Sequence, residues 1–320
     1  SYLVNLYDLL SKIYLKDDKY KLSLKFSIKR NITSIYSEKN KKFDKNILLD
    51  TIKKYNVFYK SLKMPFKINT NNTIFHENLV FLVGFPRSGT TLLDTILRSH
   101  SKTHVLEEKP YLLDVRHQYF RNNNLENVLE ISENEIINLQ KKYFNSFNYT
   151  EEKIIIDKFP LNLIELGFIK KIFPKSKIIL ALRHPLDSIL SCVLTSFKIN
   201  EAMANYENLE TASFFYNEVF QLFDIYKNIL KISFYQIKYE NVLENFNQEI
   251  RNLLNYMDLE FEESVINYYV TAKKRDKINT PSYYQVIQPI YKNSLNRYKK
   301  FPETEKVRPL INKWIKKFEY

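Results

Sequence analysis

Glycine, cysteine and histidine are scarce in this 320-residue sequence, and their scarcity excludes several kinds of protein. The chain has three glycines, five histidines and a single cysteine, Cys192. One cysteine excludes an internal disulfide and is typical of a reducing compartment. Scattered histidines and a lone cysteine do not provide the closely spaced ligands of a zinc site. We therefore expect neither disulfides nor a bound metal.

Long apolar stretches are also missing. No apolar run approaches the roughly 20 residues that cross a bilayer as a helix, and the start, Ser1-Tyr2-Leu3, is not typical of a signal peptide. Hydrophobic residues make up 44% of the chain and charged residues 27%, which is ordinary for a globular protein. With the single cysteine, these features predict a cytoplasmic protein without a membrane span.

The net charge of +13 is concentrated at one end of the chain. Residues 1–70 contain 16 Lys and Arg against 6 Asp and Glu, whereas residues 71–320 contain 33 against 30. No recognised nucleic-acid-binding module accompanies the basic end. We interpret it as a solvated surface and expect no nucleic-acid partner.

The N-terminal part of the chain has the apolar spacing of helices. Apolar residues recur at helical intervals from Leu3 to Ile13 and from Tyr20 to Ile28, with a polar turn at 16–19 between them. A further helix is predicted at 47–62. A helical hairpin cannot bury its own apolar face, so it should pack on the next domain or on neighbouring repeats. A polar linker at 69–73 divides the chain into a helical extension, 1–72, and a second domain, 73–320.

In the second domain, short apolar runs alternate with amphipathic segments. The runs predict strands at 79–83, 103–106, 153–156, 178–182 and 232–237. The amphipathic segments predict helices at 91–99, 161–173, 185–196, 202–230 and 242–257. This alternation predicts an α/β fold with a mainly parallel, P-loop-like sheet flanked by helices. Ligands of such sheets bind at the carboxyl ends of the strands.

Two of the three glycines lie at the end of the first predicted strand, in the run Gly84-Phe85-Pro86-Arg87-Ser88-Gly89-Thr90-Thr91. Glycines placed there indicate a tight turn or the close approach of a ligand. Thr90 and Thr91 begin a helix, whose N–H groups and dipole favour a phosphate or sulfate. Arg87 adds a cationic fork suited to a tetrahedral oxyanion. A Walker loop would require Lys where Thr90 stands, so we predict an anion site of another kind.

This loop resembles the 5'-phosphosulfate loop of sulfotransferases, and the resemblance extends from about residue 79 to residue 301. Arg183 and Ser191 match the arginine and serine with which that family binds the 3'-phosphate of its nucleotide. The sequence is similar above all to protein-tyrosine sulfotransferases and to bacterial sulfotransferases that follow tetratricopeptide repeats. The hairpin before the loop resembles one degenerate tetratricopeptide unit and is a candidate surface for a protein partner.

The resemblance implies a donor, 3'-phosphoadenosine 5'-phosphosulfate (PAPS), whose product is adenosine 3',5'-bisphosphate (PAP), and it implies no metal. Lys158, after the strand at 153–156, matches a lysine that stabilises charge on the leaving nucleotide. An exposed solubilising charge is the alternative interpretation of Lys158. The other matching donor-binding positions are Arg87, Ser88, Gly89, Thr90 and Thr91 in the loop, Tyr239 after the last strand, and Ser282, Tyr283, Tyr284, Gln285 and Arg297 near the C-terminus.

The resemblance also implies a catalytic base. Tyrosine sulfotransferases use one glutamate of the pair that corresponds to Glu107-Glu108, and alignment without a gap from Arg87 places the base at Glu108. Glu107 is then a structural partner. Many other sulfotransferases use histidine, so His104 and His117 remain alternatives. Glu108 is expected to accept the proton of an acceptor hydroxyl.

The acceptor itself is left open. Pro110 and Thr195 stand where tyrosine sulfotransferases have arginines that bind the peptide and the donor, so a peptidyl tyrosine, a glycan and a small molecule all remain candidates. The single cysteine and the lack of an anchor favour a cytoplasmic enzyme of bacterial type. Two other functions are retained: a P-loop-like nucleotide-dependent kinase, which requires ATP and Mg²⁺, and a non-catalytic helical-repeat scaffold with a vestigial nucleotide fold.

Overall fold

A five-stranded parallel sheet forms the centre of the protein. The computed structural model describes residues 2–40, 42–62, 78–150, 152–273, 287–288 and 295–320. The sheet has the order β2–β3–β1–β4–β5, and each pair of neighbouring strands is parallel. The strands are β1 Leu79–Gly84, β2 Thr103–Glu107, β3 Ile154–Lys158, β4 Lys177–Leu182 and β5 Tyr235–Lys238. The predicted α/β fold with a mainly parallel sheet is confirmed.

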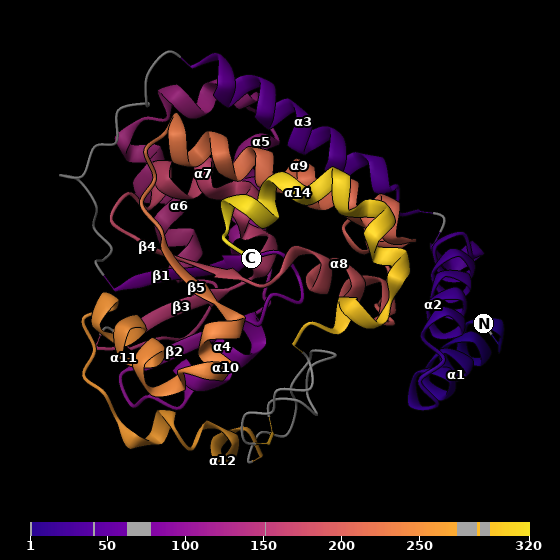
Figure 1. Cartoon of the computed structure of the whole chain (residues 1–320). Helices are drawn as coiled ribbons and strands as arrows, with labels where there is room; N and C mark the ends of the chain where they lie inside the picture. Colours follow the sequence, from indigo (N-terminus) through magenta and orange to yellow (C-terminus); the bar gives the residue numbers. More distant parts are fainter. Residues whose placement is uncertain (1, 41, 63–77, 151, 274–286, 289–294) are drawn as a thin grey trace.

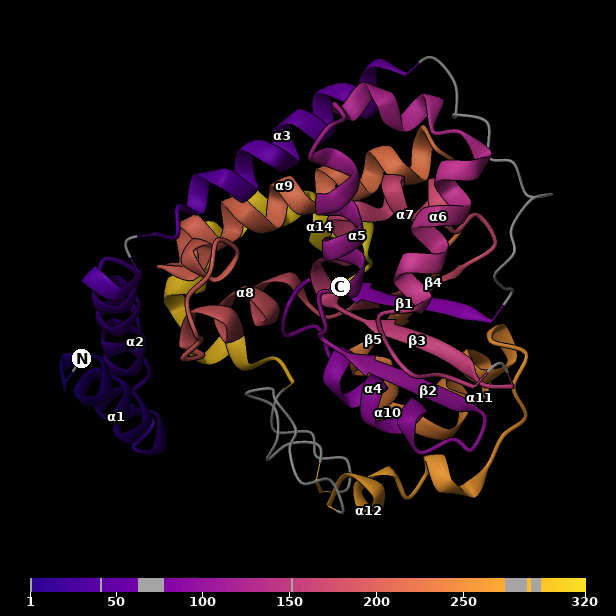
Figure 2. The same ribbon diagram turned by 180° about the vertical axis from the view of Figure 1, so that it is seen from behind.

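Helices cover both faces of this sheet (Figures 1 and 2). Successive residues of β1 point to opposite faces, so Phe81 and Val83 lie in one hydrophobic core and Val80 and Leu82 in the other. The larger core contains α3 Lys45–Ser61, α5 Tyr111–Phe120, α6 Glu133–Phe144, α7 Leu166–Ile172, α8 Pro185–Leu194, α9 Leu209–Asn228 and α14 Arg308–Lys317. The smaller core contains α4 Thr90–Arg98, α10 Tyr239–Glu244, α11 Phe246–Tyr256 and α12 Tyr268–Lys273.

Short 3-10 helices connect several of these elements. They are η1 Glu38–Asn40, η2 Leu125–Glu130, η3 Pro160–Glu165, η4 Met203–Tyr206, η5 Glu263–Val265, η6 Arg297–Lys300 and η7 Pro302–Val307. Among the helices that the structure describes, none combines the length and the apolar character needed to cross a bilayer.

The structure departs from the predicted elements in a few places. The segment at 202–230 is divided into η4 and α9, because Asn208 caps α9: its Oδ1 accepts a hydrogen bond from the backbone N–H of Thr211 at 2.9 Å. The segment at 242–257 is likewise divided into α10 and α11, at Asn245. Strand β5 begins at Tyr235 and not at residue 232, and Ile232 packs in the larger core instead.

The helical extension packs directly on the α/β part of the chain. Helices α1 Tyr2–Lys16 and α2 Tyr20–Ile35 form a hairpin beside α8, and α3 runs along α9 (Figure 1). The buried guanidinium of Arg30 in α2 donates hydrogen bonds to three carbonyl oxygens at the end of α8, those of Val193 at 2.9 Å, Leu194 at 3.2 Å and Thr195 at 3.0 Å. The predicted linker and domain boundary near residue 72 lie outside the described residues.

Candidate active site at the carboxyl edge of the sheet

The predicted anion loop connects β1 to α4 at the carboxyl edge of the sheet. Gly84 touches the neighbouring strand so closely that an added Cβ would lie 2.5 Å from the carbonyl oxygen of Ala181. Gly89 has a φ of 96°, in the left-handed region that favours glycine, and its added Cβ would lie 2.6 Å from the ring of Tyr239. Gly89, which precedes α4, has no side chain to cap the start of the helix. The first N–H groups of this helix therefore face the loop, where they favour an anion.

Four predicted donor-binding residues meet beside this loop. Arg87 Nε donates to Ser191 Oγ at 3.1 Å, and Arg183 Nη1 donates to the backbone carbonyl of Arg87 at 3.2 Å. The guanidinium of Arg183 lies over the ring of Tyr239, with 5.1 Å between Cζ and the ring centroid. Burial lowers the pKa of Arg87, and the charges of Arg183 and Arg297 act in the same direction. Negative charge placed here would be stabilised by this local excess of cations.

Helix α8 carries Ser191 and brings a distant segment to the site. Arg183 follows β4, and Nδ1 of the next residue, His184, accepts a hydrogen bond from the backbone N–H of Leu186 at 3.2 Å. Burial and nearby cations lower the pKa of His184 to about 4, so its ring is neutral and able to accept this bond. The ring stacks on Tyr298 of η6 with centroids 4.2 Å apart. This contact places the predicted donor-binding residue Arg297 beside α8.

Lys158 and Glu108 form an ion pair next to the loop. Lys158 ends β3 and pairs in register with Leu82 of β1 and with Glu107 of β2. Its Nζ lies 2.7 Å from Glu108 Oε1 and 3.9 Å from Glu107 Oε1. The Lys158 side chain is fully buried, whereas that of Glu108 is 39% exposed. Thus a buried cation holds a carboxylate that solvent, or an acceptor, can reach.

The backbone at this ion pair fixes the direction of Glu108. Its N–H donates to the carbonyl oxygen of Lys158 at 2.9 Å, which extends the pairing of β2 and β3 by one residue. Glu108 has a φ of 47°, in the left-handed region that a non-glycine residue occupies at an energetic cost. Such strained positions occur often at functional sites. The left-handed conformation turns the chain away from the sheet and toward α5.

The two histidine alternatives lie elsewhere. His104 sits within β2 opposite Ile155, three residues before the strand ends, and burial lowers its pKa. His117 lies on the exposed side of α5. Glu107, by contrast, is close to Lys158. The two glutamates thus lie together beside Lys158 at the end of β2, and the two histidines lie at other positions.

The sequence did not single out two carboxylates near Arg183, of which Asp187 is buried and Glu240 is partly buried. Asp187 Oδ2 lies 3.7 Å from Arg183 Nη2, and Glu240 Oε1 accepts a hydrogen bond from the backbone N–H of His184 at 2.9 Å. Burial raises the pKa of both carboxyl groups. Asp187 follows Arg183 by four residues, a spacing that could have revealed it. Four predicted donor-binding residues, Ser282, Tyr283, Tyr284 and Gln285, lie outside the described residues.

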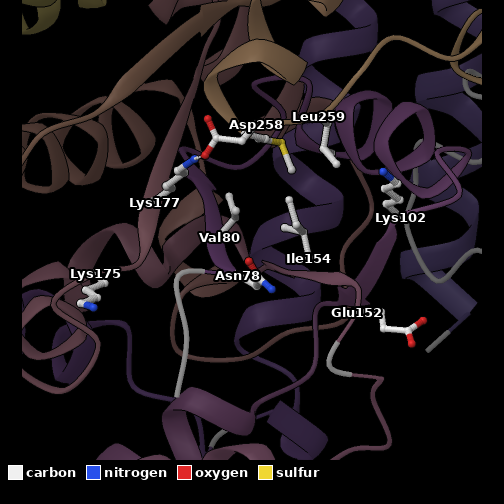
Figure 3. A pocket seen from close by; sticks show the side chains of 10 residues that line it. Asn78, Val80, Lys102, Glu152, Ile154, Lys175, Lys177, Asp258 and Leu259 are labelled. Carbon is white, nitrogen blue, oxygen red and sulfur yellow. Dashed lines mark hydrogen bonds and ion pairs between the residues drawn. The ribbon is translucent and has the colours of Figure 1, made fainter. Parts of the chain in front are cut away.

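A cavity of about 570 Å³ lies at the opposite, amino edge of the sheet (Figure 3). Its lining includes Val80 and Ile154 near the starts of β1 and β3, and the lysines Lys102 and Lys177. Lys177 forms an ion pair with Asp258. Of the described residues that line this cavity, none belongs to the predicted site. The residues predicted to act chemically are gathered at the carboxyl edge instead.

Comparison with known proteins gives the family of the chain. The pattern described as the sulfotransferase family matches residues 79–263, which are more than half of the chain. The chain belongs to the sulfotransferase family. The matched region of this sulfotransferase begins at β1 and includes the anion loop, Glu108, Lys158 and α8.

The sulfotransferase has relatives at low identity. An uncharacterized protein of Aquifex aeolicus (strain VF5) is 26% identical over 253 residues, which cover 75% of this chain but 33% of that protein, so this chain spans about a third of its relative. The sulfotransferase domain from the Synechococcus PCC 7002 olefin synthase is 18% identical, covers 78% of this chain and 98% of its own, and has a TM-score of 0.48. Mouse sulfotransferase SULT7A1 complexed with PAP is 13% identical, and the match covers 76% of this chain and 86% of that protein with a TM-score of 0.44.

Proposed function

We propose that this sulfotransferase moves a sulfuryl group from PAPS to the hydroxyl of an acceptor, at the carboxyl edge of its sheet. The observation that carries the proposal is the 2.7 Å contact between buried Lys158 and accessible Glu108, directly beside the anion loop. It places a cation suited to a leaving phosphate next to a carboxylate suited to accept a proton. A kinase loop would need a lysine at Thr90, and this loop has none.

The residues present fit the two anionic ends of the donor. The hydroxyl of Ser88 is buried and makes no hydrogen bond within the described chain, which is what a ligand-binding group in the loop should show. The helix N-terminus and Arg87 suit the 5'-phosphosulfate. Arg183 and Ser191 suit the 3'-phosphate. Because Tyr239 lies under Arg183 and the charge of Arg297 acts on Arg87, we assign these two residues to the nucleotide as well.

The proposed mechanism is an in-line transfer. PAPS bound here would supply an activated sulfuryl group: the acceptor oxygen would form a bond to its sulfur while the S–O bond to the nucleotide phosphate breaks and PAP leaves. Arg87 and Lys158 supply fixed positive charge that stabilises the leaving phosphate. Lys158 contacts Oε1 of Glu108, which leaves the second carboxylate oxygen to accept the proton of the acceptor hydroxyl. The chain thus positions charge and moves one proton.

The acceptor is a peptidyl tyrosine, a glycan or a small alcohol or phenol. The two positions that depart from the tyrosine enzymes have other uses here. Pro110 precedes the first turn of α5, and the hydroxyl of Thr195 donates to the carbonyl oxygen of Ser191 within α8 at 2.6 Å. Neither position supplies a cation for an acidic peptide, so a neutral hydroxyl compound fits this site better than an acidic peptide does.

Calorimetric titration tests the donor. We expect PAP to bind at least about tenfold more tightly than ATP with Mg²⁺, because ATP lacks the 3'-phosphate that we assign to Arg183 and Ser191. Tighter binding of ATP would favour the kinase instead, and binding of neither nucleotide would favour the scaffold. Turnover is then measured as PAP released from PAPS in the presence of a panel of phenols, alcohols, sugars and tyrosine peptides.

A further inference from the structure

Helix α4 contains a buried carboxylate that the proposed mechanism does not yet use. Asp94 lies in the second turn of this helix, in an otherwise apolar run, and its side chain is fully buried. A buried carboxylate is costly unless cations or hydrogen bonds accompany it. The groups around Asp94 therefore indicate the role of this carboxylate.

The two oxygens of Asp94 have different neighbours. Oδ1 accepts a hydrogen bond from Arg98 Nε at 3.0 Å, and Arg98 Nη2 lies 2.9 Å from the same oxygen. Oδ2 makes no hydrogen bond within the described chain and faces Lys158 Nζ at 3.6 Å. Arg98 thus orients the carboxylate through one oxygen, and the other is directed at the lysine.

Lys158 therefore lies between two kinds of carboxylate. On the side of β2 are Glu107 and Glu108, the second of which is partly exposed. On the side of α4 is Asp94, which is completely enclosed. When Glu108 turns to an acceptor and takes up a proton, it no longer offers Lys158 a full negative charge. Asp94 cannot turn away in the same manner, because Arg98 holds it.

We propose that Asp94 is a positioning residue, which holds the Lys158 ammonium in place beside the loop while Glu108 serves the acceptor. This inference rests on the proposed function, because it takes from it the roles of Lys158 and Glu108. Asp94 touches neither the acceptor hydroxyl nor the loop arginine. It acts on the reaction through Lys158, from the helix that begins at the anion loop.

The substitution Asp94→Asn tests the charge with little change in volume. The amide can still accept from Arg98 but places no anion beside Lys158. We expect kcat for release of PAP from PAPS to fall about 10- to 100-fold, since a displaced catalytic group commonly costs that much. The Kd for PAP should stay within about twofold, because the contacts of Arg87, Arg183 and Ser191 do not include Asp94. Loss of PAP affinity as large as the loss of kcat would overturn the inference.

A second readout needs no donor. Acetic anhydride modifies an amine only when the amine is both uncharged and reachable by solvent, so the modification rate of the buried Lys158, measured by peptide mass spectrometry against Lys177 as reference, reports how firmly its ammonium is held in place. The rate should rise several-fold in Asp94→Asn. An unchanged rate overturns the inference even if PAPS is the wrong donor. Failure of the unsubstituted protein to bind PAP, with a raised rate in the variant, overturns the proposed function alone.

Two further variants separate charge from packing. Glu165→Gln also neutralises a buried carboxylate that pairs with an arginine, Arg116 at 3.0 Å, and it lies outside the proposed site. It should leave kcat unchanged. Arg98→Gln keeps the Asp94 charge but removes the group that orients it, so kcat should fall by a smaller factor than in Asp94→Asn. A loss of kcat in Arg98→Gln that equals the loss in Asp94→Asn would contradict a role for the charge itself. An equal loss in Glu165→Gln would show that neutralising any buried carboxylate has this effect, and the inference would fail.

Discussion

The two edges of the sheet both carry lysine–carboxylate pairs, yet they differ in what surrounds them. At the carboxyl edge, the side chains of Lys158 and Asp94 are fully buried, and arginines and carboxylates accumulate around the anion loop. At the amino edge, Lys177 pairs with Asp258, whose side chain is 85% exposed, at the rim of an open cavity. Pairs of the same residue types are thus buried at the carboxyl ends of the strands and exposed to solvent at the amino ends.

Exposure to water determines how strongly each ion pair is screened and therefore how much it contributes electrostatically. A buried ion experiences its neighbours with little screening, so its position and protonation matter to any charge that develops nearby. An exposed pair is screened and contributes between nothing and about 1 kcal/mol. We therefore expect the chemistry where charges are buried together at the carboxyl edge, and not at the cavity of the amino edge.

The largest effect is expected from Arg87→Asn at the carboxyl edge. Arg87 has a φ of 71°, and asparagine tolerates this left-handed backbone better than alanine does, so the substitution removes the guanidinium with little added strain. Turnover of PAPS should fall about 100- to 1,000-fold, as measured by release of PAP. A loss below about threefold would mean that the buried cations do not act on the donor.

Glu108→Gln should lower kcat about 100-fold through loss of the base. The Kd for PAP should remain within about twofold, since Glu108 lies outside the contacts of the arginines. Glu107→Gln is the matched variant, because both residues face Lys158. If Glu107→Gln lost more kcat than Glu108→Gln, the roles within the pair would be exchanged.

Asp157, next to Lys158, should make stability depend on pH. Burial raises the pKa of its carboxyl group from 3.8 to about 7. Between these values the folded chain keeps a proton that the unfolded chain releases, so the free energy of unfolding falls as the pH rises through this range. Asp157→Asn removes the titration and should be more stable than the unsubstituted protein at pH 8, by up to about 4 kcal/mol.

Urea unfolding at pH 5 and pH 8 measures this difference. The amino-edge variant Asp258→Asn serves as the control, because its carboxylate is exposed and its removal should change the free energy of unfolding by less than about 1 kcal/mol. An advantage of Asp157→Asn that is equal at the two pH values would show that Asp157 does not titrate in this range.

The smallest effect is expected at the amino edge. Lys177→Ala removes the ion pair with Asp258 and should change the free energy of unfolding by less than about 1 kcal/mol, because the pair is exposed. The Kd for PAP should be unchanged in calorimetry. A tenfold change in that Kd would show that the amino edge contributes to PAP binding, and the two edges would then not differ in function.

The sequence was sufficient to predict the sheet and the residues at its carboxyl edge, since glycines, arginine and paired glutamates stand at the ends of apolar runs. It did not reveal Asp94, although an Asp–Arg pair at an interval of four in a helix that is otherwise buried is a usable signal. Contacts such as that of Lys158 with Asp94 join residues far apart in the chain and become visible only when the strands are placed. Helix α6 was also missed, even though Ser132 and Glu135 form a capping box at its start.

The hydrogen bonds of Arg30 limit where the chain can be shortened without disturbing α8. A fragment that began at β1 would keep every strand but would leave three carbonyl oxygens at the end of α8 without the guanidinium that they accept from. The same helix carries Ser191, which Arg87 contacts. A fragment meant to keep the end of α8 intact should therefore start at α2, well upstream of the anion loop.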